Sequence, residues 1–217
     1  MAADRLATLS DGTVFARDFI KLGDIEENSV LAFCGDVALG YEILGDLRRF
    51  CGKIRSEIKR PVSLEGKCNL LKTAARINLT DILWIMEEWH FGALLGGYDR
   101  THGKAIYSFN VPSLILRQHD YWADGSGYKD ARAFLHQSFR KNLDSAQAVG
   151  LALAAVRAAG VFETSVSHPY GDPAPNVKLI DKNGIADISA EAVEKHRAQA
   201  KKTEDVFRNS KKNRGRK

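Results

Sequence analysis

A chain of 217 residues with 44% hydrophobic and 27% charged side chains is expected to fold as one soluble globular domain around a sizeable core. Its longest apolar stretch, residues 149–159, is far shorter than the about 20 residues of a membrane-spanning helix, and residues 1–5 show no apolar run typical of a signal peptide. The net charge of +5 comes from residues 191–217, which hold ten Lys or Arg and four Asp or Glu. We therefore predict a folded domain over residues 1–190 and a basic tail, partly helical or disordered, over 191–217.

The first half of the chain predicts strands followed by two helices. An Asp-Gly turn at 10–13 precedes residues 14–22, which are expected to form one strand or two short ones, and the apolar run 30–35 fits a buried strand. Apolar residues then recur every three or four positions over 36–59, as on one face of a helix. A second helix is expected over about 64–86.

The second half repeats that order. Runs at 91–99 and 104–109 flank a short glycine-containing turn and predict a hairpin, and residues 113–118 predict another strand. Helices are expected at about 128–141 and, with Asp144 or Ser145 as N-cap, up to about residue 159. Residues 169–175 predict a loop, 176–181 a strand and 182–185 a turn, and beyond Ser189 the sequence favours a helix with almost no apolar face.

This order excludes a series of single βαβ crossovers, because the helices come as two consecutive pairs. It predicts the α+β class, in which a sandwich of two antiparallel sheets carries one helix pair on each outer face, a four-layer α/β/β/α arrangement.

Several local segments, in order and spacing, resemble the β-type subunits of the proteasome core particle, members of the N-terminal nucleophile (Ntn) hydrolase superfamily. No single segment is specific. The matching segments are Ala2-Ala3-Asp4-Arg5, Lys21-Leu22 with the stretch to Gly35, Gly97-Tyr98-Asp99 with Gly103 to Tyr107, Gly125-Ser126-Gly127, and Lys178 to Ile185. The resemblance runs from about Ala2 to Ile188. The Gly-Tyr-Asp hairpin and residues 180–185 are most similar to the non-catalytic β4 type.

The resemblance implies a set of site positions. In the family an N-terminal threonine is the nucleophile and its own α-amine the base, since a free α-amine has a pKa of about 7.7–8.0. Asp4 matches the carboxylate that orients a lysine, and Lys21 matches that lysine. Gly35 matches the oxyanion-hole backbone, which holds the developing negative charge. Ser126 matches an accessory serine, and Glu163 stands where the family has an aspartate.

The family's nucleophile has no counterpart here, because only Met1, Ala2 and Ala3 precede Asp4, and Thr8 and Thr13 follow it. Two explanations stay open. Either the chain is a truncated product or gene model, whose missing residues could hold anything, or the subunit is inactive and architectural. The runner-up function is an active threonine endopeptidase whose N-terminal Thr and first strand are absent from this chain. A sheet without a central strand would expose unpaired backbone groups, which favours truncation, whereas the β4 likeness favours inactivity.

Three of these site positions also have an ordinary structural interpretation. Asp4 and Lys21 could be a surface ion pair, and Ser126 could lie in a tight turn that opens a helix. A triad of Ser167, His168 and Asp172 on one proline-rich loop is improbable. The six histidines lack metal-binding spacing, so no metal and no cofactor are expected.

The leading hypothesis is a catalytically silent β-type subunit that packs with other α- and β-type proteasome subunits in stacked rings, around a chamber where peptide substrates are hydrolysed. A third hypothesis is a stand-alone binding protein whose basic tail binds nucleic acid, although a solubilising or targeting tail is favoured.

Cys34, Cys51 and Cys68 show no CxxC spacing and are expected to be reduced thiols of a cytoplasmic or nuclear protein, with no membrane partner.

Overall fold

The computed structural model describes residues 1–8, 14–16, 18–79, 91–99, 103–110, 114–163, 166, 174–196 and 198. The expected turn at 10–13, the end of the second helix beyond Leu79, most of the loop at 169–175 and the tail beyond 198 lie outside these residues. None of the helices within the described ranges is long and apolar enough to cross a membrane.

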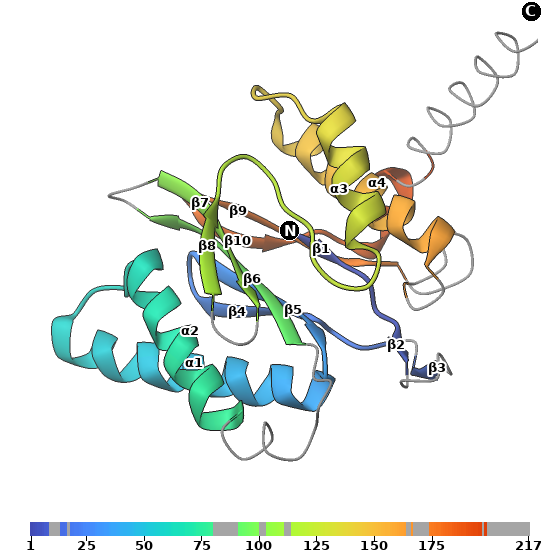
Figure 1. The fold of residues 1–217 in the computed structure, drawn as a ribbon. Helices are drawn as coiled ribbons and strands as arrows, with labels where there is room; N and C mark the ends of the chain where they lie inside the picture. The colour runs from blue at the N-terminus through green and yellow to red at the C-terminus, as the bar shows by residue number, and fades with distance from the viewer. Residues whose placement is uncertain are drawn as a thin grey trace, which may run out of the picture.

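The elements follow the predicted order (Figure 1). They are β1 (Ala2–Ala3), β2 (Ala7–Thr8), β3 (Val14–Ala16), β4 (Leu22–Glu26), β5 (Ser29–Gly35), α1 (Val37–Ile58), α2 (Leu64–Leu79), β6 (Phe91–Asp99), β7 (Gly103–Asn110), β8 (Leu114–Gln118), α3 (Tyr128–Ser138), α4 (Ser145–Phe162), β9 (Asn176–Asp181) and β10 (Gly184–Asp187).

Two antiparallel sheets face each other between two pairs of helices, which confirms the four-layer α+β arrangement (Figure 1). One sheet has the order β4-β5-β6-β7-β8 and carries α1 and α2 on its outer face. The other has the order β1-β9-β10 and lies between the first sheet and the α3/α4 pair. A short β2-β3 pair stands apart from both.

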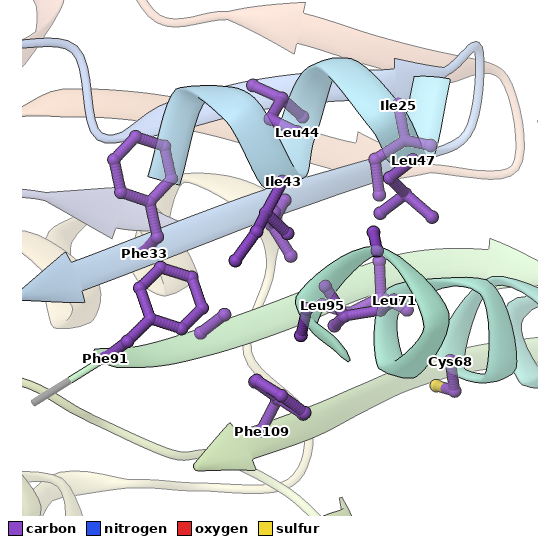
Figure 2. Close-up of a cluster of buried hydrophobic side chains, with 14 of the residues drawn as sticks. Ile25, Phe33, Ile43, Leu44, Leu47, Cys68, Leu71, Phe91, Leu95 and Phe109 are labelled. Carbon is purple, nitrogen blue, oxygen red and sulfur yellow. The ribbon is translucent and has the colours of Figure 1, made fainter. Parts of the chain in front are cut away.

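Side-chain alternation along the strands fills the spaces between these layers. On β5, Leu31 and Phe33 face α1 and α2, whereas Val30 and Ala32 face the second sheet. The layer beneath the helices is the largest apolar cluster, and Figure 2 shows its aromatic and aliphatic side chains converging from α1, α2 and the sheet. Within the described residues, a third apolar layer lies between β1, β9 and α4, and a further cluster lies between α3 and α4.

The helix ends show where local signals are strong. Asp36 caps α1, its Oδ1 accepting a hydrogen bond from Leu39 N at 2.8 Å. Of the two N-cap candidates for α4, Asp144 is the cap, and with Gln147 it forms a capping box, in which each side chain accepts from the other residue's backbone N–H.

Three predictions of local structure need correction. Helix α3 ends at Ser138 rather than Lys141, because Phe139 is extended and its ring packs against Tyr121. Helix α4 continues beyond residue 159 to Phe162. Residues 184 and 185, expected in a turn, open strand β10, which pairs with β9. In the short helical segment after Ser189, Val193 is the one buried residue among residues 190–196, and it packs against α4.

Strand β4 is a further difference, because we expected a strand to end at Leu22 and β4 begins there. Its residues include Gly23 and two acidic side chains, which weaken the local strand signal. A side chain at Gly23 would have its Cβ 2.1 Å from Leu44 Cδ2 of α1, so the glycine lets the helix approach the sheet. Tertiary packing thus decides this strand.

Candidate functional site

Asp4 and Lys21 form an ion pair at the end of the sheet sandwich. Lys21 Nζ lies 2.9 Å from Asp4 Oδ1 and 3.1 Å from Oδ2, and the side chains are only 12% and 16% exposed. Asp4 Oδ2 also accepts from Leu6 N, and the Lys21 carbonyl accepts from Phe33 N, so both residues are anchored by backbone contacts. The structure therefore brings together these two predicted residues and orients the ammonium group of Lys21.

Gly35 ends β5, two residues after Phe33, whose N–H donates to the Lys21 carbonyl. Its φ of +91° lies in the left-handed region that glycine adopts without steric cost, and the following residue, Asp36, already caps α1. The chain therefore turns sharply from strand to helix at the position where an oxyanion hole was predicted.

Ser126 lies in a turn between β8 and α3, made of Gly125, Ser126 and Gly127 and called here the glycine turn. Gly125 has a φ of +100° and packs on the side chain of Cys34; a Cβ at this glycine would lie 3.4 Å from Cys34 Cβ. Ser126 is exposed. Because Cys34 directly precedes Gly35, the contact places the glycine turn beside the β5 end of the site.

Glu163 lies at the C-terminal end of α4, as its position in the sequence predicts. Its N–H donates to Ala159 O, and its carbonyl accepts from Val166 N. A Cβ at Gly127 would meet both Ala159 and Val166, so the segment around Glu163 packs against the glycine turn. The residues of the predicted triad, Ser167, His168 and Asp172, lie outside the described residues.

Three side chains that we did not assign to the site converge on Gly92 at the start of β6. A Cβ there would lie 3.0 Å from Cys34 Sγ and 3.2 Å from both the Asn110 side-chain amide and Asp124 Oδ2. With the Asn110 amide oriented to satisfy its neighbours, its nitrogen donates to Asp124 Oδ2 at 3.0 Å. The one sequence signal was that Asp124 directly precedes the glycine turn.

Burial and neighbouring charges shift the pKa values of Cys34 and Asp124 in this cluster. Burial raises the pKa of Cys34 to about 12, aided by the Asp124 carboxylate, while a backbone hydrogen bond with Gly92 and the charge of Lys21 oppose the shift. Burial also raises the pKa of Asp124, against the stabilising effects of Gly125 N–H and the Arg132 guanidinium. The thiol is therefore protonated at neutral pH, and ionising Asp124 costs free energy.

Arg132 of α3 holds the segment before the glycine turn. Its guanidinium carbon lies 3.6 Å from the ring centroid of Trp122 and 4.6 Å from that of Tyr128, while its Nε donates to Ala123 O at 2.8 Å. Trp122 thus packs against an arginine in a cation–π contact.

Alkylation of the native protein provides a direct check on these thiols. Burial raises the pKa values of Cys34, Cys51 and Cys68 to about 12, 11 and 12, and only the thiolate reacts. At pH 8 we expect each cysteine to react with iodoacetamide at least about a hundredfold more slowly than a free thiol of pKa about 8.5. Peptide mass mapping distinguishes the three cysteines. Protein unfolded in guanidinium is the control, in which all three thiols should react. Fast labelling of Cys34 in the native protein would contradict its burial.

The described residues contain no group of three or more His, Cys, Asp or Glu side chains arranged to hold a metal ion.

Comparison with known proteins adds information that the geometry lacks. A family model described as "Proteasome subunit" matches residues 1–167. The proteasome subunit beta of Acidothermus cellulolyticus is 29% identical over 208 residues, which cover 89% of this chain and 68% of that protein. Those of Jonesia denitrificans and Streptomyces griseus are 26% and 28% identical, over 87% and 78% of this chain. The alignments span only 62% and 59% of these two relatives.

Proposed function

This chain belongs to the proteasome subunit family, and from that premise we propose that it is a β-type subunit of a proteasome core particle. It works by packing side to side with related α- and β-type subunits in stacked rings, through heterologous contacts that close. The observation that carries the proposal is the four-layer fold itself, with both helix pairs present outside the two facing sheets.

The native mass of the purified protein, alone and co-expressed with an α-type subunit, tests this assembly. We expect a species several times the 24.0 kDa of one chain, measured by size-exclusion chromatography with light scattering. A single 24 kDa species under both conditions would exclude the ring subunit.

We further propose that the subunit is catalytically silent and shapes the chamber where other subunits cleave peptides. Support comes from the β6–β7 hairpin, with Gly97-Tyr98-Asp99, and the β9–β10 hairpin, with residues 180–185, which resemble the non-catalytic β4 type. Both are formed as hairpins in the structure, so the resemblance concerns folded elements.

A second candidate, an active threonine endopeptidase, is favoured by the close and nearly buried pair of Asp4 and Lys21. A silent subunit has no need of an oriented lysine, whereas in an active one this lysine would polarise the nucleophile.

Peptide hydrolysis by the assembled protein separates the two candidates. With this chain as the sole β-type subunit, we expect fluorogenic peptides to be cleaved no faster than in buffer. Hydrolysis that falls at least about a hundredfold in Lys21→Ala, the scale of losing a proton-transfer residue, would instead establish the active enzyme. Lys53→Ala, on the exposed face of α1, is the matched control and should leave any hydrolysis unchanged.

A further inference from the structure

The segment that leads into the glycine turn is tied to the rest of the molecule at two neighbouring residues. Ala123 is held through its carbonyl by Arg132, whose guanidinium lies against the rings of Trp122 and Tyr128. Asp124 is held through both carboxylate oxygens: Oδ1 accepts from Gly125 N at 2.9 Å, and Oδ2 accepts from the Asn110 amide at 3.0 Å. The turn is thus anchored to α3 on one side and to the end of β7 on the other.

These anchors determine what the turn contacts. Asp124 Oδ2 and Cys34 Sγ border the same small space above Gly92, and Gly125 packs directly on Cys34. Cys34 in turn lies near enough to Lys21 and Asp4 to experience their charges. The carboxylate therefore connects the segment that carries Ser126 with the strand end that carries Gly35.

We propose that Asp124 is a positioning residue of this site: through Asn110 and Gly125 it holds the glycine turn against Cys34, and so sets the place of Ser126 beside Gly35 and the Asp4–Lys21 pair. The inference rests on the proposed function only in treating these residues as the positions that match the family's site, and it holds for the silent and the active candidate alike. Asp124 acts through the turn and need not touch a substrate.

The burial of the Asp124 carboxylate argues against a role for its charge in stabilising the fold. Burial disfavours the ionised carboxylate of Asp124 and raises its pKa, so its charged form costs free energy at neutral pH. An isosteric Asp124→Asn variant removes that cost: its oxygen can accept from Gly125 N, and its amide nitrogen can donate to the Asn110 oxygen once the Asn110 amide turns over. We therefore expect its melting temperature to equal or exceed that of the wild type.

Two local measurements on the full chain test the proposal. In Asp124→Ala we expect the amides of residues 125–127 to exchange with solvent at least about tenfold faster, because both hydrogen bonds of the carboxylate are lost. Cys34 should also be alkylated faster at pH 9, because the variant removes the neighbouring carboxylate that helps to raise the pKa of the thiol. In Asp124→Asn we expect the amides of residues 125–127 to exchange as slowly as in the wild type. Cys34 should be alkylated faster in this variant too, because the charge is removed.

The exposed Asp120, in the same segment, supplies the matched control Asp120→Asn, which should change neither measurement. If the amides of residues 125–127 exchange as slowly in Asp124→Ala as in the wild type, the proposal is overturned. If that variant does not fold, Asn110→Ala removes the partner instead, and unchanged exchange there overturns it equally. Neither measurement requires assembly, so a chain that stays monomeric counts against the ring subunit and leaves the result on Asp124 intact.

Discussion

Replacing Lys67 by methionine is expected to lower the free energy of unfolding by about 3–5 kcal/mol, the cost of leaving a buried charge without its partner. Lys67 is fully buried in α2, and its Nζ lies 2.8 Å from Glu26 Oε2, whose side chain is only 5% exposed. The same Nζ donates to Asn28 Oδ1 at 3.0 Å. Methionine fills a similar volume, so the loss reports the Glu26 carboxylate left with only the Arg55 guanidinium, 4.0 Å away, rather than a cavity. Urea denaturation followed by circular dichroism measures it.

A second substitution separates the charge from the packing. Adding Glu26→Gln to Lys67→Met neutralises the remaining charge and keeps an oxygen for Val62 N, which donates to Glu26 Oε2. We expect the double variant to recover at least half of the lost stability. Lys53→Met, an exposed lysine of α1, is the control and should change stability by less than about 0.5 kcal/mol. A Lys67→Met loss below 1 kcal/mol would show that the pair is not required.

Replacing glycine by alanine should have opposite effects on stability at two positions, Gly97 and Gly45. Gly97→Ala in the central strand β6 is expected to cost about 1–3 kcal/mol, as overpacking does in well-packed cores. The new Cβ would lie 2.8 Å from the backbone oxygen of Asn28 and 2.4 Å from Leu64 Cδ2, and the backbone contact cannot be relieved by a rotamer change.

Gly45→Ala in α1 should stabilise the protein by about 0.5–1 kcal/mol, because alanine loses less conformational freedom in a helix. Gly45 is exposed, and a Cβ there would meet nothing within 4 Å. Thermal denaturation of both variants beside the wild type measures the difference. Equal effects of the two substitutions would contradict the close packing at Gly97.

Most of the elements could be predicted because their signals are local. The repeat of apolar residues every three or four positions predicted α1, and the glycine-containing turn predicted the β6–β7 hairpin. Strand β4 and the exact end of α3 were missed, since Gly23 beneath Leu44 and Phe139 beside Tyr121 depend on contacts with distant parts of the chain.

Some residues of the candidate site could be predicted from the sequence, and others could not. Asp4, Lys21, Gly35 and Ser126 were named from a resemblance in motif and spacing, and the structure joins Asp4 to Lys21 in one ion pair. Their roles in catalysis stay predictions, as does that of Glu163. Asn110, Asp124 and Arg132 carried no comparable motif, because they act by contact across three separate segments.

The sequence by itself determined the order of strands and helix pairs, and with it the four-layer architecture, because patterning and capping are properties of neighbouring residues. Only the tertiary structure decided which polar groups are buried together: Lys67 with Glu26, and Asp124 with Asn110 beside Cys34. Burial changes the free energy of a charge far more than any local preference does, and burial depends on how the layers pack.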